Sequence, residues 1–209
     1  MNTWKRGRAG PALAAALLLA GAATLTGPAR AESGMTADPT VEVMAGACAF
    51  CHGTDGNGVG ASIPSIAGLP IETFTYMMTS YRDGTNPATV MDRIARGYSA
   101  EQIEALATYF AEKPFHRAPQ PWINVALVPD GKDLAAEYCE SCHENEGRDG
   151  EGVGILAGQK LNYMRFSVHD FLSEAREMER RQARKFRDLM DERGPDGFEA
   201  VLNYYASVP

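Results

Sequence analysis

The sequence carries one five-residue pattern twice, as "CAFCH" at Cys48–His52 and as "CESCH" at Cys139–His143. In each copy two thiols lie three positions apart, and an imidazole follows directly. Thiols at that spacing on one helical turn can each form a thioether with a haem vinyl group, and the next histidine then faces the iron. The pattern therefore predicts two covalently bound haem c groups, attached at Cys48, Cys51, Cys139 and Cys142, with His52 and His143 as iron ligands.

Other uses of these cysteines fit less well. A structural zinc site needs four ligands, whereas each copy supplies three, with no fourth Cys or His at a repeated position. A thioredoxin-like dithiol belongs in a strand-helix setting, which this sequence does not indicate. Disulfides are the usual fate of cysteine in an oxidising compartment. All four cysteines, however, lie within the repeated pattern, which favours haem.

A second iron ligand is expected from methionine. Met91 follows His52 by 39 residues and Met178 follows His143 by 35, and this methionine pair recurs at equivalent places. The alternative is core packing, which methionine does well. His116 and His169 have no counterpart in the other copy, and we expect both to be ordinary surface or packing residues. An iron with two protein ligands has no open position, so the haems should transfer single electrons.

The two copies extend well beyond the cysteines. "SIAGLPIETFTYMMTSY" (65–81) aligns with "ILAGQKLNYMRFSVHDF" (155–171) at an offset of 90 residues, and "ALATYFAEKP" (105–114) aligns with "AVLNYYASVP" (200–209) at an offset of 95. This order predicts an all-α protein made of two tandem domains related by internal duplication. We place the domains at 32–113 and 132–209, joined by a linker at 114–131 that holds four prolines and should be extended.

Helical patterns support this division. Asp38 and Pro39 suggest an N-cap followed by proline at the first helical position, and Ser99 with Gln102 suggests a capping box. Apolar residues at i, i+3, i+4 and i+7 predict the buried face of the last helix in each domain. These residues are Ile103, Leu106, Ala107 and Phe110 in the first domain, and Phe198, Val201, Leu202 and Tyr205 in the second.

The first 31 residues are typical of a secretory signal peptide. Lys5, Arg6 and Arg8 precede an apolar run that closes on Ala29-Arg30-Ala31, which predicts cleavage after Ala31 and a periplasmic location. Cleavage removes four of the 20 Lys and Arg and none of the 27 Asp and Glu, leaving a net charge of −11. Such a polyanion is a poor nucleic-acid binder. No later segment is apolar enough to span a bilayer, so we expect no membrane span after cleavage.

Taken together, these residues resemble the di-haem cytochromes built of two class I cytochrome c domains: cytochrome c4 and the haem subunit of flavocytochrome c sulfide dehydrogenase. "MDRIARGYSAEQIEALATYF" (91–110) and "REMERRQARKFRDLM" (176–190) look more like the flavocytochrome subunit. The resemblance implies Met91 and Met178 as axial ligands, and for Pro64 a carbonyl that orients the proximal histidine. The second copy lacks that proline, which puts the role in doubt for its haem.

The same resemblance implies a FAD-containing flavoprotein partner in a heterodimer, and a soluble cytochrome or an oxidase as electron acceptor. Sulfide chemistry would then belong to the partner, so this chain would be a non-catalytic subunit. The alternatives are a freestanding cytochrome c4-like carrier and a di-haem peroxidase. The basic stretch from Arg176 to Arg193 is either a solvated helix with i,i+4 ion pairs or a docking surface.

Overall fold

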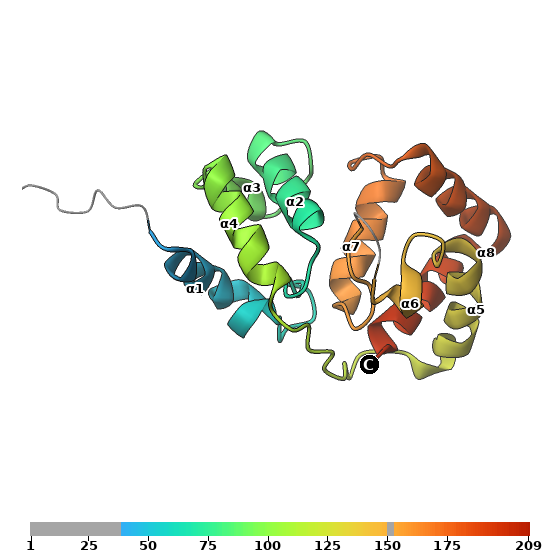
Figure 1. Ribbon diagram of the computed structural model, residues 1–209. Helices are drawn as coiled ribbons and strands as arrows, with labels where there is room; N and C mark the ends of the chain where they lie inside the picture. Colours follow the sequence, from blue (N-terminus) through green and yellow to red (C-terminus); the bar gives the residue numbers. More distant parts are fainter. Residues whose placement is uncertain (1–38, 150–152) are drawn as a thin grey trace, which may run out of the picture. The chain divides into compact units, whose positions relative to one another are not determined.

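The computed structural model describes residues 39–149 and 153–209. The predicted signal peptide lies outside the described residues. Within the described ranges all regular structure is helical, as predicted. Figure 1 labels the α-helices. In chain order the elements are α1 (Val41–His52), η1 (Thr54–Gly56), α2 (Ile71–Asp83), α3 (Met91–Ala95), α4 (Ala100–Ala111), η2 (Val125–Leu127), α5 (Val128–Tyr138), α6 (Glu144–Gly147), α7 (Leu161–Leu172) and α8 (Arg180–Ser207).

The start of the first helix differs from the prediction. Helix α1 begins at Val41 with Thr40 as N-cap, because the Thr40 carbonyl accepts the first helical hydrogen bonds, from the Val43 and Met44 N–H groups at 3.1 Å. Pro39 therefore precedes the helix instead of opening it. The Ser99 capping box is confirmed: its hydroxyl accepts from the Gln102 N–H, and the Gln102 side chain accepts from the Ser99 N–H.

The linker also differs from the prediction near its C-terminal end. Helix α5 begins at Val128, so residues 128–131, which the sequence places in an extended linker, are helical. Pro129 is tolerated there because the first turn of a helix needs no N–H donor. Asn124, at the start of η2, accepts from the Ala126 N–H and so fixes the turn that leads into α5.

Two hydrophobic cores lie in the two halves of the chain. The first is built from α1, α2, α3 and α4, and the second from α5, α7 and α8. Both predicted stripes are confirmed as buried, since none of their eight side chains is more than 7% exposed. In the second half, α5 packs along the C-terminal part of α8 (Figure 1). At Gly131 this packing is so close that an added Cβ would lie 2.0 Å from the Ala200 carbonyl oxygen.

Helix α8 is interrupted at Gly194, whose φ of +61° and ψ of −158° are not helical. A glycine in a positive-φ conformation commonly ends a helix, and Pro195 is suited to begin the next one. The arginine-rich residues 180–193 and the core-forming residues 195–207 are thus separate helical segments.

The internal duplication is visible in matching backbone hydrogen bonds. The Gly56 carbonyl accepts from the Ile66 and Ala67 N–H groups, and the Gly147 carbonyl accepts from those of Leu156 and Ala157. Both glycines have φ near +80°, a conformation that L side chains rarely adopt. In addition, the Gly68 and Gly158 N–H groups donate to the carbonyls of Phe110 and Tyr205, each at 2.8 Å. In each half, the loop that follows the C-x-x-C-H histidine is therefore bonded to the last helix in the same way.

Candidate functional site

The first histidine is buried and held by the backbone. Helix α1 ends at His52, which is 8% exposed, and its Nδ1 lies 2.8 Å from the Pro64 carbonyl oxygen. A carbonyl carries no proton, so Nδ1 must be the protonated nitrogen and Nε2 keeps its lone pair. Burial lowers the pKa of His52, although the bond to Pro64 opposes this. The result is a neutral imidazole whose Nε2 is available to a metal.

The second histidine has the same arrangement without a proline. His143 Nδ1 lies 3.1 Å from the carbonyl oxygen of Gly154, the residue 90 positions after Pro64. Burial again lowers the histidine pKa. The doubt raised by the missing proline is thus removed, because the orienting group is a backbone carbonyl, which every residue has.

The four cysteines are all free thiols. Cys48 and Cys51 lie on the last turns of α1, whereas Cys139 is the C-cap of α5 and Cys142 lies in the turn that follows. Burial raises the pKa of Cys48, and raises that of Cys139 to about 12. Thiols with such pKa values stay protonated at neutral pH, and a protonated thiol is a poor nucleophile for disulfide exchange.

These donors fit haem c. In each half, two unpaired thiols at the required spacing precede a neutral imidazole with a free Nε2, which is the donor set that covalent attachment and iron ligation need. The imidazole of His52 is buried and that of His143 is half-buried. When bound, haem c would supply one-electron chemistry, and it would be attached through Cys48 and Cys51 in one half and through Cys139 and Cys142 in the other. Oriented by their carbonyls, His52 and His143 would hold the iron.

The two predicted methionines lie in different surroundings. Met91 is the first residue of α3 and packs, half-buried, against the first core, as does Cys48. Met178 is half-buried in the segment just before α8. Among the described residues, the methionines that border or enter the second core are Met164 and Met190, and Met178 is not one of them. Ligation by Met91 and Met178 therefore stays a prediction. The unmatched His116 and His169 are both exposed, as expected.

Gln159 is a residue to which sequence reasoning assigned no role. Its side-chain oxygen accepts from the Ser65 N–H at 2.9 Å, and its side-chain nitrogen donates to the Ser65 carbonyl at 2.9 Å. These bonds join the second half of the chain to the residue that follows Pro64. The available signal was a break in the repeat, since Gln159 aligns with Leu69 in the first copy.

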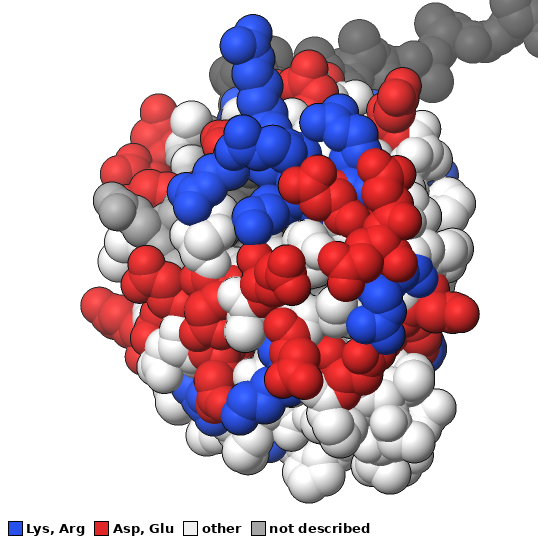
Figure 2. Space-filling view, turned by 90° about the vertical axis from the view of Figure 1, so that its right-hand side faces the viewer, with Lys and Arg blue, Asp and Glu red and all other residues white. Residues whose placement is uncertain are grey.

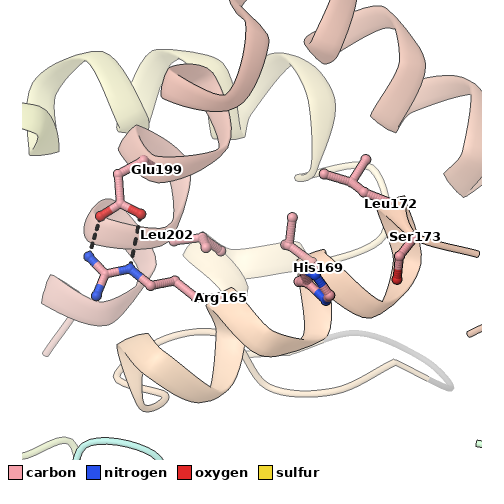
Figure 3. A pocket seen from close by; sticks show the side chains of 7 residues that line it. Arg165, His169, Leu172, Ser173, Glu199 and Leu202 are labelled. Atoms are coloured by element: carbon pink, nitrogen blue, oxygen red, sulfur yellow. Dashed lines mark hydrogen bonds and ion pairs between the residues drawn. The ribbon is translucent and has the colours of Figure 1, made fainter. Parts of the chain in front are cut away.

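A surface groove of about 420 Å³ lies between α7 and α8 (Figure 3). Arg165 and Glu199 form a two-pronged ion pair beside it, with one nitrogen-to-oxygen distance of 3.0 Å. This pair lowers the pKa of Glu199 and raises that of Arg165. None of the residues predicted to bind haem lines the groove; its walls are Arg165, Val168, His169, Leu172, Ser173, Glu199 and Leu202.

The first segment of α8 carries a cluster of basic side chains, which Figure 2 shows as a blue area bordered by acidic residues. Arg180, Arg181, Arg184 and Arg187 are exposed, and none forms an ion pair with a carboxylate in the described part of the chain. The i,i+4 pairs considered for this stretch are thus not found there. We call these four residues the arginine surface; it begins two positions after Met178.

Comparisons with known proteins show which proteins this chain resembles. The family model described as "Cytochrome C oxidase, cbb3-type, subunit III" matches residues 36–110. The cytochrome subunit of sulfide dehydrogenase from Chlorobaculum tepidum is 39% identical over 105 residues, which cover 46% of this chain and 90% of that protein. The thiosulfate dehydrogenase electron acceptor from Thiomonas intermedia is 31% identical over 137 residues, covering 59% of this chain and 62% of that relative.

The fold has a counterpart among solved structures. Reduced recombinant cytochrome c4 from Pseudomonas stutzeri aligns with a TM-score of 0.69 and 20% identity, over 81% of this chain and 97% of that one. The alignment covers most of both described halves, so the fold is that of two tandem class I cytochrome c domains. The domain boundaries that we placed at 113 and 132 remain predictions.

Proposed function

Because this chain belongs to the family of c-type cytochromes that includes the cytochrome subunit of sulfide dehydrogenase, we propose that it is a two-haem electron carrier serving a sulfide-oxidising flavoprotein. As a cytochrome c it contains covalently bound haem c and transfers electrons. The proposal adds a FAD-containing donor subunit, one haem in each half, and a soluble cytochrome or an oxidase as acceptor. The similarity to the Chlorobaculum tepidum protein along 90% of its length carries it.

We further propose His52 with Met91, and His143 with Met178, as the axial iron ligands. The hydrogen bonds from Nδ1 to Pro64 and Gly154 support the histidines, since each leaves Nε2 free. Two protein ligands on each iron leave no position for peroxide, which argues against a peroxidase. A thioether ligand favours ferrous iron and so suits an electron acceptor of raised potential.

Location is part of the proposal. The leader at residues 1–31 supports export to the periplasm with cleavage after about Ala31. In the described part of the chain, no helix combines the length and the apolar character that crossing a membrane requires.

The haem count and ligands can be tested on the protein as expressed in a host that attaches haem c. The mass of the mature chain should correspond to two added haem groups, and a single haem would contradict the proposal. Met91→His and Met178→His should each lower one reduction potential and leave the other in place. Met78→Leu and Met190→Leu are the controls, because these methionines lie in or against the two cores.

The donor can be tested by purification from the native host. A flavin-containing partner should copurify, and sulfide should then reduce the haems rapidly; a lone cytochrome that such a flavoprotein cannot reduce would contradict the proposal. The similarity to thiosulfate dehydrogenase electron acceptors favours a second candidate, in which a thiosulfate-oxidising enzyme is the donor. Rapid reduction by thiosulfate with its dehydrogenase, and not by sulfide with the flavoprotein, would select that candidate.

A further inference from the structure

We propose that Gln159, in the second half of the chain, tunes the reduction potential of the haem held by His52 in the first half. It would act as a positioning residue, through the peptide group between Pro64 and Ser65. The inference rests on the proposed function, because it takes His52 as an iron ligand.

One peptide group connects the two residues. The Pro64 carbonyl accepts from His52 Nδ1 at 2.8 Å, and the Ser65 N–H, which belongs to the same planar amide, donates to the Gln159 side-chain oxygen at 2.9 Å. Hydrogen bonds in such a chain polarise one another. The bond to Gln159 therefore increases the negative charge on the Pro64 oxygen and makes it a stronger acceptor for the imidazole.

The surroundings keep this peptide group in place. Ser65 is 1% exposed and Gln159 is 3% exposed, so little water competes for the bonds. The Gln159 side-chain nitrogen donates to the Ser65 carbonyl at 2.9 Å, and the Ser65 hydroxyl accepts from the Gly58 N–H at 3.1 Å. In a buried setting of low dielectric, each of these bonds is stronger than it would be at the surface.

The other half lacks this support. At the offset of 90 residues, Ser65 aligns with Ile155 and Gln159 aligns with Leu69, whose side chain has no hydrogen-bonding group. His143 thus has the carbonyl of Gly154 but no side-chain amide from the opposite half at the equivalent position. The effect of Gln159 should therefore fall on one haem.

The direction of the effect follows from the chemistry of the ligand. A stronger acceptor at Nδ1 raises the electron density on the imidazole, which stabilises ferric iron and lowers the reduction potential. Loss of the Gln159 amide should therefore raise the potential of the first haem and leave the second unchanged.

The test is a spectroelectrochemical titration of the full-length, haem-loaded protein. Gln159→Met keeps the side-chain length and removes both hydrogen bonds to Ser65, together with the one that the Gln159 side-chain oxygen accepts from the Lys160 N–H, so the first potential should rise. Gln159→Glu keeps an oxygen that accepts from the Ser65 N–H, so the first potential should stay or fall. The matched control is Asn203→Leu, which removes a fully buried amide whose bonds go to Glu199 and Asn124.

The two potentials are assigned with Met91→His and Met178→His. The wild-type protein should show two reduction potentials, one lowered by Met91→His and the other by Met178→His. If Gln159→Met then moves neither potential, or moves both equally, the inference is overturned while the proposed function stands. If no haem is ligated by His52, the proposed function itself fails. A measurement without variants is the NMR exchange rate of the Ser65 amide in the wild-type protein: it should exchange slowly, and fast exchange would overturn the inference.

Discussion

His143 Nδ1 lies 3.1 Å from the carbonyl oxygen of Gly154, which stands where the first half has Pro64. The two halves thus use the same backbone group on two very different residues. An added Cβ at Gly154 would meet no atom within 4 Å, and its φ is not in the positive region.

From this relationship we predict that Gly154→Ala stabilises the protein without moving either reduction potential. Alanine restricts the unfolded chain more than glycine does, which is worth about 0.4–1 kcal/mol where the native conformation suits it. Urea unfolding followed by circular dichroism measures the change. The reverse experiment is Pro64→Ala, which should lower stability by about the same amount through the same effect. A large shift of the first potential in Pro64→Ala would show that the proline ring matters beyond its carbonyl.

Two helical glycines should respond oppositely to alanine. At Gly131 in α5, the new Cβ would lie 2.0 Å from the Ala200 carbonyl oxygen, whereas at Gly46 in α1 it would meet nothing within 4 Å. Overpacking costs about 1–3 kcal/mol or more, so Gly131→Ala should destabilise the second half by at least that amount. Gly46→Ala should stabilise α1 by about 0.5–1 kcal/mol, because alanine is the better helix former. Thermal unfolding of the two variants side by side tests both signs; equal effects would contradict the packing argument.

The ion pair of Arg165 with Glu199 predicts a pH-dependent contribution to stability. Arg165 lowers the pKa of Glu199 in the folded protein. The stabilisation of the folded protein by this ion pair is therefore fully present above the unfolded-state pKa, which is about 4.3 for glutamate. It is lost as the pH falls through the lower pKa that Glu199 has in the folded protein. Both side chains are partly exposed, so about 1 kcal/mol or less is expected at pH 7.

Glu199→Gln is the variant for this measurement. Its stability deficit relative to the wild type should be visible in urea unfolding at pH 7 and should shrink toward pH 3. The pair of Arg82 with the exposed Asp83 supplies a control, since Asp83→Asn should cost little at either pH. A deficit for Glu199→Gln that grows on acidification would refute the predicted direction of the pH dependence.

The sequence predicted those features that depend on neighbouring residues. The Ser99 capping box and the buried stripes of α4 and α8 both follow local spacing, and both are confirmed by the structure. The predicted start of α1 was wrong by a few residues. The N-cap is Thr40, whose backbone carbonyl accepts the first helical hydrogen bonds, and no side-chain capping bond marks this position in the sequence.

Local sequence patterns could not predict contacts made by backbone groups or by residues far apart in the chain. The Gly154 carbonyl is invisible in a sequence, since every residue has one. The contact of Gln159 with Ser65 spans 94 positions, and only a fold brings these residues together. Met178 shows the opposite case: its spacing from His143 predicts a ligand, whereas Met190, which packs against the second core, has no methionine at the equivalent place in the first copy.

The arginine surface should govern encounter with an acidic partner. Charge reversal of Arg181 or Arg184 should slow electron transfer with a negatively charged partner protein several-fold at low salt, because exposed charges steer association. The effect should fade at high salt as the charges are screened. Arg93→Glu is the matched control, an exposed arginine two positions after Met91 in the other half. Stopped-flow rates across a salt series give the answer, and equal slowing by all three variants would indicate a general charge effect instead of docking.

The break at Gly194 divides α8 into two segments that meet different structural requirements. Residues after it are held by the demands of packing, and a change there risks the whole domain. Residues before it turn four arginines toward solvent and keep only a few side chains, such as Leu189, in the core. Evolution can therefore rewrite the charged segment to suit a new partner while the haem-bearing domain stays intact. That freedom allows an electron carrier to meet partners of different surface charge without changing its fold.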